Sequence, residues 1–244
     1  MPRFFIDVSY KGTAYAGFQK QNNANTIQAE VEKAFEIFYK FPIALTGSSR
    51  TDAGVHALQN FFHADVLGFR ERNFEKDAYH LNAILPQDIV INTIYEVPEE
   101  MHCRFNAQYR EYEYTLYQKK NPFLQEVAYY YPFTLNFNLL LKAASIVKEQ
   151  QQFYAFSKKK SQVGTYKCQI FESVWTQEAD VIKYRVKANR FLRGMVRALV
   201  ATMLQVAREK RTLHEFMELF EKTEVAKADF SAPAHGLKLI RVKY

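Results

Sequence analysis

The feature that most constrains the fold of this chain is an order of predicted elements that occurs twice. In the first half, the period-two or helical spacing of apolar residues predicts a strand, a helix, two strands, a helix and a strand, at residues 4–10, 27–38, 41–46, 58–66, 74–85 and 89–97. In the second half the same order is predicted at residues 110–118, 137–149, 168–177, 181–188, 192–208 and 237–242. One further helix, begun by Thr212-x-x-Glu215, interrupts the second copy. The order βαββαβ is that of the ferredoxin-like split unit.

Two copies of this unit predict an α+β fold of two ferredoxin-like lobes, residues 1–105 and residues 106–244. An antiparallel sheet shared by both lobes, with the helices packed on one face, would leave the other face free to carry a long groove. Asn25 and Gln28 are the expected N-cap and N3 residues of the first helix.

Composition favours a folded protein with a polyanionic partner. The chain has 244 residues, of which 48% are hydrophobic, so intrinsic disorder is not expected. Its net charge of +7 favours nucleic acid as the partner, although proteins of other classes are also mildly basic. No run approaches the ~20 apolar residues of a membrane helix, and the first residues lead into a strand-like segment, not a signal peptide. We therefore expect a cytoplasmic protein without a membrane segment, with Cys103 and Cys168 reduced.

The segment 47–57, Gly-Ser-Ser-Arg-Thr-Asp-Ala-Gly-Val-His-Ala, joins two predicted strands and contains one carboxylate, Asp52. Loops on rigid scaffolds often carry chemistry. Arg50, two residues earlier, could pair with Asp52 and keep it ionised and nucleophilic. The same residues also suit an ordinary turn, in which Asp52 bonds its own backbone and Gly54 takes a positive φ. The segment alone leaves both interpretations open.

The strand that opens the second lobe combines arginine and tyrosine. Alternation places Arg110, Tyr112 and Tyr114 on one face, and Glu111 and Glu113 on the other. The first face suits an RNA-binding protein, because a tyrosine ring stacks on an unpaired base while a guanidinium holds phosphate. An ordinary tyrosine-rich strand with solvated charges is the alternative.

Three arginines, Arg190, Arg193 and Arg197, lie near the start of the helix predicted at 192–208. Arg193 and Arg197 are four residues apart and therefore share a helix face. Guanidinium groups beside the positive end of a helix dipole suit a phosphate site. A solvated polar face is the alternative.

A run of three lysines, Lys158, Lys159 and Lys160, lies in a polar stretch and is suited to contacting an RNA backbone without reading sequence. The histidines and cysteines lack metal-ligand spacing, so we expect no metal site. The sequence has no glycine-rich phosphate loop of a common type, so we expect no nucleotide cofactor.

Residues 50–57, Arg-Thr-Asp-Ala-Gly-Val-His-Ala, resemble the catalytic motif of the tRNA pseudouridine synthase A family. Four more segments resemble that family in the same order: 10–21, 102–114 with His-x-Arg-Phe and Arg-x-Tyr, 193–197 with Met-Val-Arg, and 232–237 with Ala-Pro-x-x-Gly-Leu. The resemblance thus spans nearly the whole chain. Ser49 stands where the family usually has glycine, and its Cβ restricts positive φ. Phe18 stands where tryptophan is common.

The resemblance implies a role for each matching residue. Asp52 would be the catalytic nucleophile, Arg50 its partner in displacing the target base, and Tyr112 the ring that stacks on that base. Arg197 would form a salt bridge with Asp52, and Leu237 would pack against the uracil. Whether Asp52 attacks C1′ of the ribose or C6 of the base stays open.

The resemblance also implies the reaction and the assembly. The protein would be an isomerase that exchanges the N1 glycosidic bond of uridine for a C5 bond at positions 38, 39 and 40 of tRNA, in the anticodon arm, without cofactor or metal. It would be a homodimer whose subunits share one tRNA.

Two other functions compete with this one. A non-catalytic RNA-binding protein would explain the charge and the arginine–tyrosine strand, but it gives no reason for Asp52 beside two arginines. A sugar hydrolase would need a second carboxylate near Asp52, and none is evident in the sequence.

Overall fold

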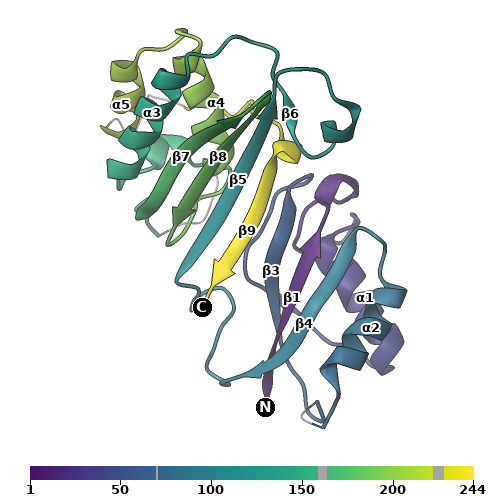
Figure 1. Ribbon diagram of the computed structural model, residues 1–244. Helices are drawn as coiled ribbons and strands as arrows, with labels where there is room; N and C mark the ends of the chain where they lie inside the picture. Colours follow the sequence, from purple (N-terminus) through teal and green to yellow (C-terminus); the bar gives the residue numbers. More distant parts are fainter. Residues whose placement is uncertain (70, 159–163, 222–227) are drawn as a thin grey trace. The chain divides into compact units, whose positions relative to one another are not determined.

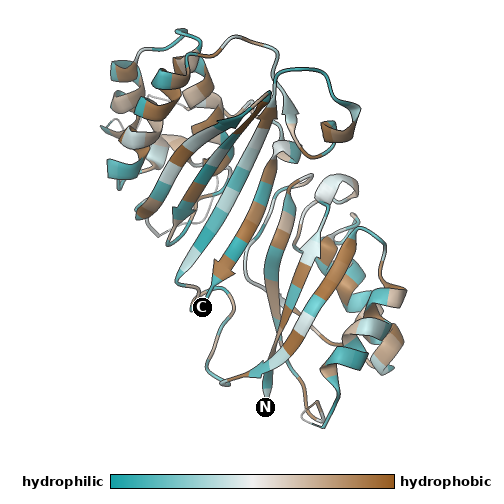
Figure 2. Ribbon diagram, in the orientation of Figure 1, coloured by the Kyte–Doolittle hydropathy of each residue, from teal (hydrophilic) through white to brown (hydrophobic). Residues whose placement is uncertain are grey.

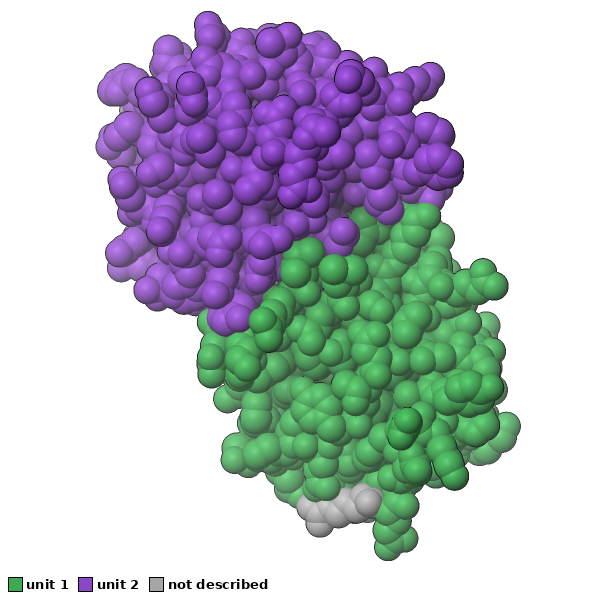
Figure 3. All heavy atoms as spheres, viewed as in Figure 1, with its two compact units in different colours: residues 1–108, 239–244 green, residues 109–238 purple. Residues whose placement is uncertain are grey.

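The computed structural model describes residues 1–69, 71–158, 164–221 and 228–244, and these ranges hold nine strands and five α-helices (Figure 1). The predicted α+β class is therefore confirmed. The chain forms two compact units (Figure 3), which we call unit 1 (Met1–Gln108 with Leu239–Tyr244) and unit 2 (Tyr109–Lys238). The division into lobes at residue 105 stays a prediction.

Unit 1 has the element order that the sequence predicts. Its elements are β1 (Arg3–Tyr10), α1 (Ile27–Tyr39), β2 (Thr46–Gly47), β3 (His56–Asp65), α2 (Phe74–Ile84) and β4 (Ile89–Val97), followed by most of the last strand, β9 (Leu237–Lys243). β1 lies between β4 and β3 and is antiparallel to both, and β2 pairs antiparallel with β3. This is the pairing of a ferredoxin-like unit.

The strand predicted at 41–46 is wrong in extent, because only Thr46 and Gly47 pair with β3. Ile43 and Leu45 are both buried, whereas Ala44 between them is exposed. The alternation in the sequence therefore reflects burial of every second side chain, which does not require ladder hydrogen bonds.

Helices α1 and α2 cover one face of the sheet of unit 1 (Figure 1). Phe4 of β1 packs against Phe74 at the start of α2, with ring centroids 5.2 Å apart. α1 begins behind Thr26, whose hydroxyl accepts the N–H of Ala29 at 3.3 Å. The predicted N-cap, Asn25, is thus wrong by one residue, because Thr26 has the extended backbone and the side-chain oxygen that a cap requires.

Unit 2 carries the second set of elements. These are β5 (Tyr109–Tyr117), β6 (Tyr129–Tyr130), α3 (Phe137–Glu149), β7 (Ile170–Glu178), β8 (Val181–Ala188), α4 (Met195–Ala207) and α5 (Leu213–Glu221). β8 lies between β5 and β7 and is antiparallel to both. The short β6 pairs parallel with β5, so the sheet is mixed and the prediction of a purely antiparallel sheet is wrong at this point. The long connection at 118–128 makes this possible, since it returns the chain to β5 in the same direction.

Helices α3, α4 and α5 lie on one side of the sheet of unit 2 (Figure 1), and hydrophilic and hydrophobic residues alternate along its strands (Figure 2). Trp175 of β7 packs against Tyr184 of β8, with ring centroids 4.9 Å apart, and donates its Nε1–H to the sulfur of Met203 in α4 at 3.4 Å. The face that carries Trp175 and Tyr184 is therefore the helix-covered face. In the described ranges, none of the helices has both the length and the apolar character that crossing a membrane requires.

Candidate active site

Asp52 lies in a tight turn of unit 1 between β2 and β3. The carbonyl of Asp52 accepts the N–H of Val55 at 3.2 Å, and Gly54 inside the turn has a φ of +79°. The positive φ of Gly54, which the ordinary-turn interpretation predicts, is thus confirmed. Asp52 is half-buried and Arg50 is exposed. The turn presents the carboxylate at the surface of unit 1 on a short, defined piece of backbone.

A second loop, residues 11–18, lies directly against this turn. The N–H of Gly12 donates to Nδ1 of His56 at 3.0 Å, and the N–H of Phe18 donates to the carbonyl of Thr51 at 3.1 Å. A Cβ on Gly12 would lie 2.1 Å from the carbonyl oxygen of Val55, so only glycine permits this approach. The segment that resembles the opening loop of the family is therefore part of the support for Asp52.

Ser49 and Phe18, which differ from the residues usual in the family, are both accommodated by the structure. Ser49 is buried and is not one of the residues with positive φ in the described ranges, so its Cβ causes no conflict of the expected kind. Phe18 is buried and stacks on Phe62 of β3, with ring centroids 4.5 Å apart and an interplanar angle of 11°.

In unit 2, the predicted alternation along β5 is confirmed, and the register identifies its faces. Tyr114 lies opposite Tyr184 in the ladder, so Arg110, Tyr112 and Tyr114 are on the helix-covered face. Tyr114 has no exposed surface, and its hydroxyl donates to the carbonyl of Pro233 at 2.8 Å. Burial raises the pKa of Tyr114. Tyr114 is therefore a core residue, not a surface for stacking.

Tyr112 retains 8% exposure and packs edge-on against Phe191, with ring centroids 5.1 Å apart. On the opposite face, Glu111 and Glu113 both pair with Arg185 of β8, at 3.4 and 3.3 Å. The carboxylates of β5 thus neutralise a cation on the face away from the helices, and Tyr112 stays the stacking candidate on the other face.

The arginine segment before α4 differs from the prediction. Gly194, with a φ of +75°, is the N-cap, and α4 begins at Met195, not at residue 192. Arg193 therefore precedes the helix and does not share a helix face with Arg197. Arg193 is exposed, and its carbonyl accepts the N–H of Lys158 at 3.0 Å, while the Lys158 side chain lies over Gly194. Lys158 and Arg193 are thus neighbours, as a joint phosphate site requires.

The remaining residues that the sequence predicts to bind RNA are Arg190, Lys159 and Lys160. Arg190 is half-buried and lies two residues beyond the end of β8. Lys159 and Lys160 lie outside the described residues.

Arg197 and Leu237 are both linked to the segment 232–237 of unit 2, which Arg197 contacts and Leu237 ends. The Nε of Arg197 donates to the carbonyl of Ala232 at 2.7 Å. Burial lowers the pKa of His235, and the Arg197 charge contributes to this. A Cβ on Gly236 would lie 2.6 Å from the ring of Tyr114, so the segment before Leu237 fits closely against β5. Leu237 itself is buried. The sequence could not indicate that the Ala232 carbonyl accepts a hydrogen bond from Arg197, because every residue type has a backbone carbonyl.

One group of side chains has metal-ligand chemistry. His63, His102 and Cys103 offer ligand atoms within 4.8 Å of one another in unit 1. However, Nδ1 of His63 accepts the N–H of Cys103 at 3.3 Å, and Nδ1 of His102 accepts the N–H of Arg104 at 3.1 Å. The Cys103 thiol donates to the carbonyl of Thr46 at 3.2 Å. These bonds compete with metal ligation, because an imidazole that accepts at Nδ1 carries its proton on Nε2. These bonds are best explained as holding residues 102–104 against β3.

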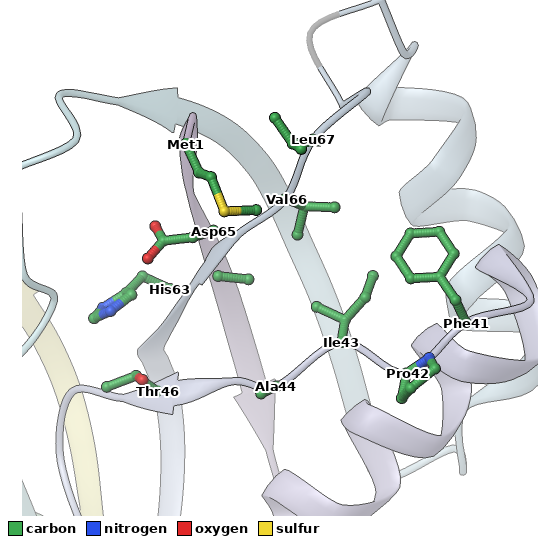
Figure 4. A pocket seen from close by; sticks show the side chains of 11 residues that line it. Met1, Phe41, Pro42, Ile43, Ala44, Thr46, His63, Asp65, Val66 and Leu67 are labelled. Atoms are coloured by element: carbon green, nitrogen blue, oxygen red, sulfur yellow. The ribbon is translucent and has the colours of Figure 1, made fainter.

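A pocket of about 540 Å³ lies near the C-terminal end of β3 (Figure 4). Residues 41–44 form one wall and the end of β3 forms another. A carboxylate on its wall, Asp65, is held by Arg3 through two hydrogen bonds of 2.7 Å. Asp52 and Arg50 do not line this pocket. It is therefore separate from the predicted catalytic loop.

Comparisons with known proteins connect these features to one family. A family model described as tRNA pseudouridine synthase matches residues 7–106 and 150–244. A protein from Parabacteroides distasonis named tRNA pseudouridine synthase A is 38% identical over 100% of this chain and 96% of its own length. Proteins of the same name from Porphyromonas gingivalis and Anoxybacillus flavithermus are 37% and 33% identical over 100% of this chain and 98% and 99% of their own lengths. The matched segments contain the Asp52 turn and the arginine segment, but not β5.

Proposed function

Because the chain belongs to the tRNA pseudouridine synthase family, we propose that it converts uridine to pseudouridine at positions 38, 39 and 40 of the tRNA anticodon arm, with Asp52 as the nucleophile. The observation that carries the choice of Asp52 is its turn. This turn holds the single carboxylate of residues 47–57 half-exposed on backbone that buried groups fix on both sides.

The reaction explains why a lone carboxylate is sufficient. The N1–C1′ bond of uridine breaks, a C5–C1′ bond forms, N1 gains a proton and C5 loses one, so nothing is oxidised and no atom is added. A carboxylate that attacks C1′ would hold the ribose as an ester until C5 of the detached uracil displaces it, and a carboxylate that attacks C6 would hold the uracil itself until C5 bonds to C1′. A cofactor or metal has no necessary step in this scheme.

The other site residues have supporting roles in the proposal. A paired base must leave its stack first, at a cost of a few kcal/mol. Arg50 would displace the base and Tyr112 would stack on it, and the edge-on contact of Tyr112 with Phe191 supports a ring that is already ordered. Arg197 would pair with Asp52, and Leu237 would pack against the uracil.

Binding would depend on the basic side chains. Arg190, Arg193 and the lysines Lys158, Lys159 and Lys160 would contact phosphates of the anticodon stem-loop, consistent with a net charge of +7. We further propose that the enzyme works as a homodimer in the cytoplasm.

Pseudouridine mapping on tRNA made by transcription tests the proposal. Transcripts should carry uridine at 38, 39 and 40 and at several other positions of the anticodon arm and elsewhere. Conversion confined to 38–40, without a change of mass and in the presence of EDTA, is the expected result. Bound but unchanged tRNA would support the non-catalytic RNA-binding alternative, and released uracil would indicate a hydrolase. Conversion only at other positions would contradict the proposed site selection.

A further inference from the structure

The side-chain amide of Asn60, in β3, is buried and hydrogen-bonded to the segment that carries Asp52. No motif in the sequence identifies this residue. Asn60 has no exposed surface. Its Nδ2 donates to the carbonyl of Ser49 at 2.9 Å and to the hydroxyl oxygen of Tyr10 at 3.1 Å. Its Oδ1 accepts the N–H of Ser49 at 3.2 Å and that of Phe61 at 2.9 Å. These four bonds use both donors and both acceptor positions of the amide, which defines a single orientation of the side chain.

Tyr10 extends this network to the residue before Asp52. Its hydroxyl lies 2.8 Å from Oγ1 of Thr51, and both residues are buried. The pairing of β1 with β3 shifts its register between Val8 and Tyr10. Such irregularities redirect side chains and occur often beside active sites. Here the shift accompanies the contact between the Tyr10 hydroxyl and the amide of Asn60.

The backbone directly before Asp52 is therefore tied to one buried side chain by two routes. One route runs through both backbone groups of Ser49, and the other runs through the hydroxyls of Tyr10 and Thr51. Resting on the proposed role of Asp52, we propose that Asn60 is a positioning residue that, through these routes, fixes the Asp52 carboxylate for attack on the nucleotide.

This role has a kinetic consequence that a purely structural role lacks. A reacting group misplaced by about 1 Å can lose on the order of 10²-fold in rate. Phosphate contacts elsewhere on the protein fix the bound position of the RNA and do not depend on that displacement. Loosening the network should thus reduce the chemical rate and leave tRNA affinity nearly unchanged.

Tyr10→Phe and Thr51→Val test the second route with little change of shape. Each should reduce the single-turnover rate about tenfold, while the Kd for tRNA stays within about twofold. The double variant should be no slower than the slower single variant, because both substitutions break the same hydrogen bond. Asn60→Ala removes all four bonds and should be slower than either.

Tyr39→Phe is the matched control. It removes a buried tyrosine hydroxyl from the same unit, where that hydroxyl donates to Asp77 at 3.0 Å. It should lower the Tm about as much as Tyr10→Phe and leave the single-turnover rate unchanged. Equal rates for Tyr10→Phe, Thr51→Val and the control would overturn the inference. Asp52→Asn in the same assay separates the two proposals, since activity in that variant would contradict the proposed function itself.

Discussion

The Asp52 turn of unit 1 precedes β3 and the arginine segment of unit 2, residues 190–194, precedes α4, but the two are packed differently. Buried groups are hydrogen-bonded to the Asp52 turn, and a Cβ on Gly12 beside it would meet fixed backbone at 2.1 Å. In the arginine segment Arg193 is exposed, and the nearest atoms to a Cβ on Gly194 would be those of the flexible Lys158 side chain, at 3.1 Å. The difference teaches that the region proposed for chemistry is fixed, whereas the region proposed for phosphate binding keeps its charges adjustable.

Gly12→Ala should produce the largest effect, because the new Cβ would overlap the Val55 carbonyl and displace the turn. We expect the single-turnover rate to fall by more than about 10²-fold, together with a lower Tm. Gly164→Ala is the matched control in unit 2, since its Cβ would have no atom of the described residues within 4 Å, and it should behave as wild type. A Gly12→Ala enzyme with normal rate and Tm would show that the turn is not rigidly packed.

The buried imidazole of His63 in unit 1 also predicts that the folded protein loses stability at acid pH. Burial, with contributions from nearby Arg3 and His102, lowers the pKa of His63 to about 4. Because this folded-state pKa is below the unfolded value, the unfolded chain binds the proton more tightly. The stabilisation is therefore fully present above about pH 6.5 and is lost as the pH falls towards 4, by on the order of 3 kcal/mol.

His63→Asn isolates this effect, because asparagine offers an acceptor in place of Nδ1 and does not titrate. Unfolding free energies at pH 7.5, 6, 5 and 4 should fall more steeply for wild type than for His63→Asn. Parallel curves would mean that His63 is not a source of the acid sensitivity.

Arg193→Gln should produce the smallest effect, on affinity alone. We expect tRNA binding to weaken a few-fold, and the slope of log K against log salt to decrease in magnitude by about one, with an unchanged single-turnover rate. Lys148→Gln, at the C-terminal end of α3, removes one exposed charge elsewhere in unit 2 and should leave the slope unaltered. Equal slopes for both variants would remove Arg193 from the proposed phosphate contacts.

Much of the fold followed from the sequence because the period of apolar residues determines which side chains share a face. Alternation correctly grouped Arg110, Tyr112 and Tyr114, but it could not identify which face the helices cover, since that depends on what packs against the strand. The start of α4 was misplaced for a local reason. Leu192 continues the apolar spacing, but Gly194 adopts a positive φ and begins the helix later.

The site was predictable in part. The positive φ expected of Gly54 is observed, and the catalytic roles of Asp52 and Arg50 stay predictions that follow from the resemblance of residues 50–57. The sequence did not single out Asn60, since it is one of several polar residues in the strand His56–Asp65 and its role depends on its partners. The available signal was that a buried amide must find hydrogen-bond partners. Those partners lie ten or more residues away, except for the adjacent Phe61.

The central claim is that Asp52 supplies the chemistry while the basic side chains supply the binding, and Asp52→Asn tests it most directly. The measurement is single-turnover pseudouridine formation beside filter binding on the same tRNA. Asp52→Asn should form no pseudouridine and keep its tRNA Kd within about tenfold of wild type, and Asp52→Glu should be nearly inactive, because one methylene displaces the carboxylate by about 1 Å. Conversion by Asp52→Asn at a rate near that of wild type would contradict the account.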